Sequence, residues 1–227
     1  MTEKTDINKG AVAETWDGMV ADWSADKETF AMPWGKLMMW IFLLGDTFIF
    51  GIFLVGYMVA RMSAVDPWPS TEEIFTMTMF GHDFPLLLIA IMTFILITSS
   101  GTMAMAVNYG YRGARKKAVM FMTATAVLGA VFLGMQVFEW SQLIFYYGIR
   151  PWGNDFGAAQ FGAVFFMITG FHGLHVLGGV VLLAIIARRV HKGHYEKKGY
   201  SVIEITGLYW HFVDLVWVFI FAFFYLL

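Results

Sequence analysis

Histidines and carboxylates recur inside long apolar stretches of this 227-residue chain. Ionisable side chains are costly in such a stretch unless they have partners, so they are the first candidates for chemistry or for contacts between helices. Asp46 lies ten residues after Lys36, which is roughly 15 Å along a helix at 1.5 Å per residue. The other candidates of this kind are Glu139, His172, His175, His211 and Asp214.

Three kinds of chemistry are compatible with this set. Residues three apart share a helix face, as His172 does with His175 and His211 with Asp214. Histidine and carboxylate on facing helices can bind a metal or a haem, carboxylates can form a proton pathway, and both can hydrogen-bond across helices. The last, purely structural interpretation is favoured. A lone carboxylate deep in an apolar segment pays a desolvation cost, so we expect Asp46 to be protonated or hydrogen-bonded to one of these four partners.

The composition identifies the environment in which these residues lie. Hydrophobic residues make up 59% of the chain and charged residues 14%, against roughly 45–50% and 25% in soluble domains. This excludes an ordinary soluble protein, and a net charge of -2 gives no attraction to nucleic acid. The chain has no cysteine, which excludes disulfides, thiolate zinc sites, iron–sulfur clusters and thiol catalysis.

Five apolar segments are long enough to cross a membrane as helices. They predict an all-α integral membrane bundle over residues 34–227, and Glu139 lies near the far end of the third segment. Residues 1–33 form a separate polar, acidic segment with apolar residues at helical spacing, for which a short helix docked on a protein surface and a solvated tail are the two hypotheses. The predicted spans are residues 34–60, 84–107, 118–146, 158–187 and 204–227.

The distribution of Lys and Arg predicts the orientation of the bundle. The first and third connections between spans contain one basic residue each, Arg61 and Arg150, whereas the second and fourth contain nine together. The second and fourth connections are therefore predicted to be cytoplasmic. With five spans this places the N-terminus in the cytoplasm and the C-terminus in the periplasm.

Two motifs in the last two spans resemble a known family. Residues 169–176 read TGFHGLHV and residues 209–217 read YWHFVDLVW. Together they resemble the signature pair of subunit III of haem-copper terminal oxidases. Residues 45–51 (GDTFIFG) and 136–140 (QVFEW) resemble the carboxylate-bearing helices of the same family. The resemblance covers residues 34–227 and is closest to the five-helix bacterial form.

This resemblance implies a non-catalytic subunit of a respiratory cytochrome c oxidase, which reduces dioxygen to water and pumps protons across the bacterial inner membrane. It implies that the chain itself binds no haem or metal, that haem and copper belong to the partner subunits I and II, and that phospholipids are held between helices. A larger respiratory supercomplex is a further implied partner. Arg189 matches the family position that meets a phospholipid head group, and Arg188 and Arg189 are our candidate lipid-binding residues.

Alternatives remain open at this point. Within the family, the chain could be the accessory subunit of a quinol oxidase or a nitric oxide reductase. From another class, the alternative is an independent proton or solute carrier. The chain also departs from the family pattern, because Asp46 occupies a position where many members have glutamate, and residues 102–107 lack the histidines that longer members have nearby.

Overall fold

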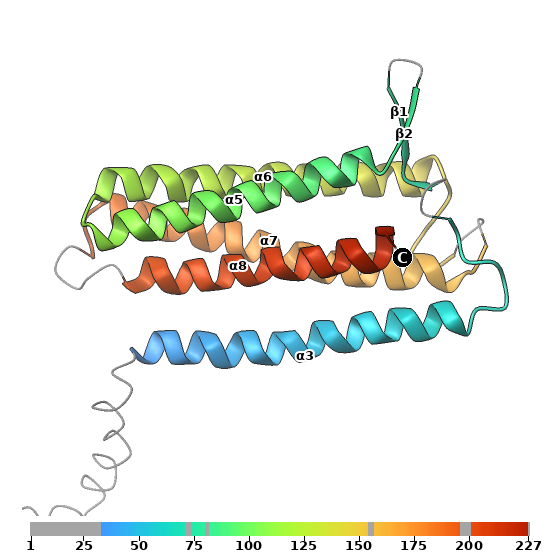
Figure 1. Cartoon of the computed structure of the whole chain (residues 1–227), viewed down its shortest axis with the longest axis horizontal. Coiled ribbons are helices and arrows are strands. Elements are labelled where there is room, and N and C mark those ends of the chain that lie inside the picture. The colour runs from blue at the N-terminus through green and yellow to red at the C-terminus, as the bar shows by residue number, and fades with distance from the viewer. Residues whose placement is uncertain (1–32, 71–73, 80–81, 154–156, 196–200, 227) are drawn as a thin grey trace, which may run out of the picture. The chain divides into compact units, whose positions relative to one another are not determined.

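Long helices dominate the computed structural model, which describes residues 33–70, 74–79, 82–153, 157–195 and 201–226 (Figure 1). Within these residues, five helices are long and apolar enough to cross a membrane, which confirms the five predicted spans. Most of the segment 1–33, with its proposed docked helix, lies outside the described residues. The helices are α3 (Trp34–Met62), α5 (Leu87–Tyr111), α6 (Arg115–Phe145), α7 (Gln160–His191) and α8 (Ser201–Phe221).

Each helix extends past one predicted end, because local hydropathy does not detect polar residues in a terminal turn. In four of them the opposite end is shorter than predicted: α5 and α7 begin three and two residues later, and α6 and α8 end one and six residues earlier. Residues 84 and 85, which the sequence analysis assigned to the second span, belong to a strand. A tight turn joins α5 to α6, where Gly113 has φ 69°, a left-handed conformation that glycine adopts without strain. The last turn of α7 includes Arg188, Arg189 and His191, whose positive charges suit the carbonyl end of a helix.

Residues 41–227 form one compact unit. Helix α5 packs against α6 and α8, and α7 packs against the same two helices. The part of α3 after Trp40 contacts α7 where the rings of Phe50 and Phe171 are 5.3 Å apart. It also contacts the short π-helix η1 (Ala222–Leu226) at the end of the chain, through Tyr57 and Phe224.

A small β-hairpin lies in the connection between α3 and α5 (Figure 1). Strand β1 (Thr76–Met79) pairs antiparallel with β2 (His82–Pro85), with Thr76 opposite Pro85. The hairpin was not predicted, because strands this short carry no signal in an analysis based on membrane-length segments. The membrane domain itself is all-α, as expected.

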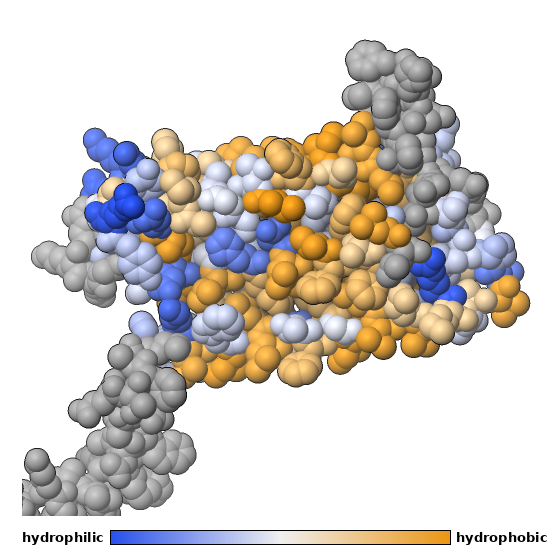
Figure 2. All heavy atoms as spheres, viewed as in Figure 1, coloured by the Kyte–Doolittle hydropathy of each residue, from blue (hydrophilic) through white to orange (hydrophobic). Residues whose placement is uncertain are grey.

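The face of the bundle seen in Figure 2 is apolar over much of its length. Large side chains such as Leu44, Phe94 and Leu174 are 60–70% exposed, which suits contact with lipid chains. The turn between α5 and α6 lies at the same end of the bundle as the end of α7 (Figure 1). The basic residues of these two regions are thus on one side, which is the side we predict to be cytoplasmic.

Candidate functional site

Asp46 of α3 lies beside His175 of α7. Its Oδ2 atom is 2.9 Å from His175 Nε2, and Asp46 is 5% exposed. The rings of Phe50 and Phe171 lie 5.5 and 4.7 Å from the His175 ring, centroid to centroid. Of the four partners considered for Asp46 in the sequence, the structure therefore places His175 in contact with it, inside an aromatic shell.

His175 has a second polar contact, with the backbone of its own helix. Its Nδ1 is 2.9 Å from the carbonyl oxygen of Phe171, which can only accept, so Nδ1 donates this hydrogen bond. The contact with Asp46 is a close approach of the two side chains, because Asp46 Oδ2 has no partner with hydrogen-bond geometry among the described residues. Asp46 and His175 thus form a polar pair between α3 and α7.

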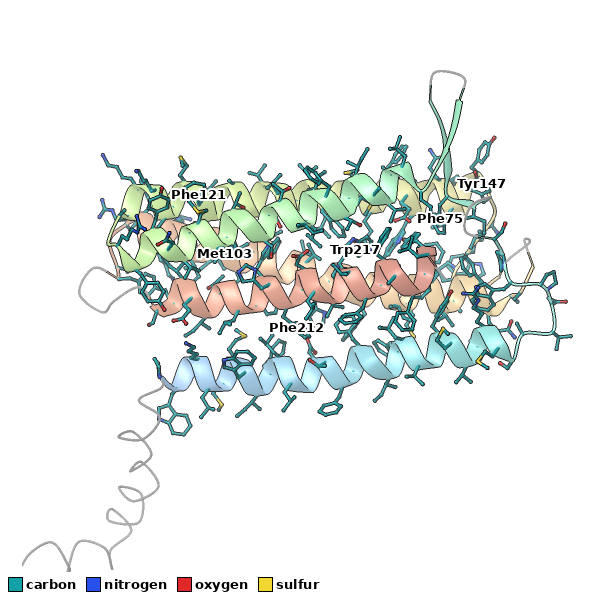
Figure 3. The ribbon with its side chains drawn as sticks, viewed as in Figure 1. Phe75, Met103, Phe121, Tyr147, Phe212 and Trp217 are labelled. Atoms are coloured by element: carbon teal, nitrogen blue, oxygen red, sulfur yellow. The ribbon has the colours of Figure 1, made fainter. Side chains whose placement is uncertain are left out.

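His172 faces a different neighbourhood, although it is only three residues from His175. It is fully buried, and its ring stacks on that of Trp217 with the centroids 5.3 Å apart. Trp217 is labelled on α8 in Figure 3. Phe132 contacts the His172 ring edge-on at 6.0 Å. Among the described residues, neither ring nitrogen of His172 has a hydrogen-bond partner. The structure therefore places His172 in an aromatic core and not beside Asp46.

Glu139 is held by the last residues of the chain. The hydroxyl of Tyr225 donates a 2.7 Å hydrogen bond to Glu139 Oε1, and both residues are at most 3% exposed. Tyr225 belongs to the π-helix η1, in which Phe224 and Tyr225 are both buried. One helical turn away, Gln136 Nε2 donates to the backbone carbonyl of Thr169 on α7 at 2.8 Å.

His211 and Asp214 lie on the side of α8 that faces α5. The hydroxyl of Ser100 is 2.7 Å from His211 Nδ1 and also lies beside the Asp214 carboxyl. All three residues are partly exposed at the surface of the bundle. The six ionisable residues singled out in the sequence thus form three separate groups and an isolated histidine.

Trp210 connects three helices at the centre of the domain. Its Nε1 donates to Ser99 Oγ of α5 at 2.9 Å, and its ring lies against Gly129 of α6 and Gly179 of α7. A β-carbon added at Gly179 would be 2.8 Å from Trp210 Cζ3, which is too close for an unstrained contact. These glycines therefore allow the indole to fit between the helices.

A groove of about 420 Å³ runs between α6 and α7 at the end of the bundle that carries the basic residues. Small and apolar residues line most of it, including Ala126, Ala130 and Ala184. Arg188 and His191 line one end, whereas Arg189 is not part of the lining. The two arginines are both exposed, so either can meet a ligand outside the protein.

Sequence reasoning did not identify several residues that complete these groups. Ser100 and Tyr225 carry hydroxyl groups, which a search for membrane spans by hydropathy does not single out. The third such residue is Tyr209, whose hydroxyl donates a 2.9 Å hydrogen bond to the His175 carbonyl. A search for hydroxyl side chains at the depth of each ionisable residue would have found all three. In the described part of the chain, no group of three or more His, Asp or Glu side chains is arranged to hold a metal ion.

Comparison with known proteins matches residues 17–227 to the family of cytochrome c oxidase subunit III. The chain belongs to the subunit III family of haem-copper oxidases. A cytochrome c oxidase subunit 3 from Thermostichus vulcanus is 34% identical over 192 residues, which cover 82% of this chain and 84% of that protein. Its counterpart from Alkalihalophilus pseudofirmus is 30% identical, covering 83% and 84%. A probable quinol oxidase subunit 3 from Staphylococcus saprophyticus is 30% identical, covering 82% and 86%.

Membership of the subunit III family confirms the resemblance seen in the sequence. Subunit III is one part of an oxidoreductase complex, so the function of this chain is exercised together with other subunits. The two motifs of the resemblance contribute the structural groups described above: residues 169–176 include His172 and His175, and residues 209–217 include Trp210, His211 and Asp214.

Proposed function

We propose that this chain is the non-catalytic subunit III of a bacterial cytochrome c oxidase, an enzyme that reduces dioxygen to water and pumps protons across the inner membrane. Subunits I and II carry the haem and copper, and this chain packs against the catalytic subunit and stabilises it. The observation that supports the proposal is that the two histidines of the motif TGFHGLHV both make contacts between helices. His175 contacts Asp46 and His172 stacks on Trp217, so both residues join helices to each other.

A quinol oxidase of the same family is the second candidate. It is favoured by relatives of that name, such as the Staphylococcus saprophyticus protein at 30% identity. Donor binding belongs to other subunits, so the residues of this chain do not discriminate between the two candidates. The assignment to cytochrome c oxidase rests on the relatives that carry this name, including one at 34% identity.

Purification through a tag on this chain tests the proposed function. In mild detergent, we expect the tagged chain to bring down haem-bearing subunits and dioxygen consumption that depends on reduced cytochrome c. Consumption driven only by quinol would assign the chain to the second candidate. A colourless chain that purifies alone and supports solute or proton transport in vesicles would contradict both and favour an independent carrier.

We also propose that phospholipid head groups bind at Arg188 and Arg189. A guanidinium can hold phosphate with two parallel hydrogen bonds. Arg188 has the groove between α6 and α7 beside it, and the alanines of that groove leave room for an acyl chain. Arg189, which lies outside that groove, occupies the position that the family resemblance assigns to a head group. In this proposal the two arginines bind the head groups of two different lipids.

Lipid content of the purified complex tests this role. We expect Arg188→Ala and Arg189→Ala each to lose about one phospholipid per complex, since each removes one bidentate phosphate ligand. Ala126→Phe fills the groove and should reproduce the loss seen with Arg188→Ala only. Lys192→Ala is the matched control, because it removes an exposed positive charge at the same helix end outside the groove lining. Unchanged phospholipid per haem in both arginine variants would refute the lipid role.

A further inference from the structure

Helix α3 is held less closely than the other four long helices. It is the least buried of the five spans in the described part of the chain. The backbones of α5 to α8 approach their neighbours at many points, whereas the backbone of α3 comes near another helix at few. At Gly45, Gly51 and Gly56 no neighbouring atom lies within 4 Å of an added β-carbon, in contrast to Gly129 and Gly179. Side-chain contacts, and not close backbone packing, therefore hold α3 in place.

Aromatic side chains fix the later part of α3. The rings of Phe50 and Phe171 of α7 are 5.3 Å apart, centroid to centroid. The ring of Tyr57 lies 4.0 Å from that of Phe224 and 5.6 Å from that of Trp68, which follows α3 in the chain. These five residues form an aromatic clamp around the part of α3 from residue 50 to residue 57.

The part of α3 before the aromatic clamp depends on weaker contacts. Asp46 Oδ2 lies 2.9 Å from His175 Nε2, but it has no partner with hydrogen-bond geometry among the described residues. Nearer the start of the helix, the rings of Phe42 and Tyr209 of α8 are 6.1 Å apart. A segment with few buried contacts opens at a lower free energy than the core of a domain. Residues 41–46 are therefore the part of α3 that opens first.

The membrane gives the pair of Asp46 and His175 particular weight. Lipid chains are as apolar as the side chains of a helix, so an apolar helix face can exchange a protein neighbour for lipid at small cost. A polar group cannot make this exchange, because lipid chains offer it no hydrogen-bond partner. The polar pair therefore opposes separation of α3 from α7, which the neighbouring apolar contacts resist only weakly.

We propose that Asp46 and His175 form a latch, which keeps residues 41–46 of α3 closed against α7 and α8. When the two side chains part, this segment swings outward about the aromatic clamp, and lipid chains take its place beside Tyr209. A few residues at the edge of the clamp absorb the change, as in other hinge motions. The proposal goes beyond the proposed function, since it concerns the conformations of this chain whichever electron donor the complex uses.

Distances between spin labels in the purified complex test the latch. The chain has no cysteine, so within it labels attach only at introduced cysteines. One pair of labels joins Ile41 of α3 to Ile185 of α7, and a second pair joins Val55 of α3 to Met167 of α7. All four side chains are 45–64% exposed. We expect Asp46→Leu to shift the first distance upward by several ångströms and to leave the second unchanged.

Two further variants separate the latch from a general effect on α3. Asp46→Asn keeps a polar group beside His175 and should leave both distances unchanged. Thr47→Val is the matched control, because the Thr47 hydroxyl donates to the Leu43 carbonyl of the same helix at 2.8 Å. It should also leave both distances unchanged. An unchanged first distance in Asp46→Leu, an equal shift of both distances, or the same shift in Thr47→Val would overturn the latch.

A measurement on the unaltered helix does not depend on how any Asp46 variant folds. Complexes labelled at either pair are frozen rapidly from a series of temperatures. We expect the distances between Ile41 and Ile185 to broaden at a lower temperature than those between Val55 and Met167, because the aromatic clamp holds the second pair. Broadening of both pairs together, or of the second pair first, would overturn the proposal.

Discussion

Replacing Gly129 by alanine is expected to destabilise the domain, whereas replacing Gly134 by alanine on the same helix is not. A β-carbon at Gly129 would overlap Trp210 Cη2 and lie 2.8 Å from Val180 Cγ2. At Gly134 no neighbouring atom lies within 4 Å of the added carbon. Overpacking of this kind typically costs about 1–3 kcal/mol of unfolding free energy.

Trp210 has little freedom to move away from the added methyl group. Its Nε1–H is bound to Ser99 Oγ, whose own hydroxyl donates to the Leu96 carbonyl at 2.6 Å. On its other side the indole touches Gly179. A shift of the ring would therefore break a buried hydrogen bond or move α7, and both add to the cost.

The two variants form a matched pair. Alanine favours the helix by up to about 1 kcal/mol over glycine at both positions, so the difference between them isolates the clash. Thermal unfolding of the purified complex, followed by helical circular dichroism, measures it. We expect a lower melting temperature for Gly129→Ala and an unchanged or slightly higher one for Gly134→Ala. Equal melting temperatures would mean that the indole does not fill this space between the helices.

Replacing Asp46 by leucine is expected to have the next largest effect, and replacing it by asparagine a small one. Leucine leaves His175 Nε2 without the partner that now lies 2.9 Å away, and an unsatisfied buried polar group costs about 1–3 kcal/mol. Asparagine can donate from its amide to Nε2 while Nδ1 stays bound to the Phe171 carbonyl. We therefore expect Asp46→Asn to assemble and to retain most dioxygen reduction.

Melting temperature, haem absorbance and dioxygen consumption of the purified complex check this expectation. The double variant Asp46→Leu with His175→Leu should be less destabilised than the sum of the two single variants, because it removes both partners together. Additive effects would show that the two residues are not coupled. Loss of haem absorbance in Asp46→Asn would instead contradict a structural role for the carboxylate and require a direct part in the catalytic subunit's chemistry.

The hydropathy of the sequence was sufficient to predict five membrane-spanning helices. Hydropathy is read from neighbouring residues alone, and the thickness of the bilayer sets how many apolar residues a spanning helix needs. Helix ends were predicted less well, since charged residues such as Arg188 and Arg189 continue a helix into the polar interface. The hairpin at Thr76–Pro85 was missed because it lies between the spans, where the bilayer imposes no length or pattern.

The partners of the ionisable residues were decided by tertiary structure. The sequence showed that His172 and His175 share a helix and a similar depth, but a rotation of α7 by a fraction of a turn determines which one meets Asp46. That rotation follows from packing, with His172 stacked on Trp217 and the indole of Trp210 against Gly179. In the same way, Tyr225 of the π-helix η1 donates a hydrogen bond to Glu139, which lies 86 residues earlier on α6. The sequence by itself therefore determined the family, the spans and the polar residues. The helix rotations that pair these residues depend on contacts between segments more than a hundred residues apart, such as the Trp210–Ser99 bond, which no local pattern encodes.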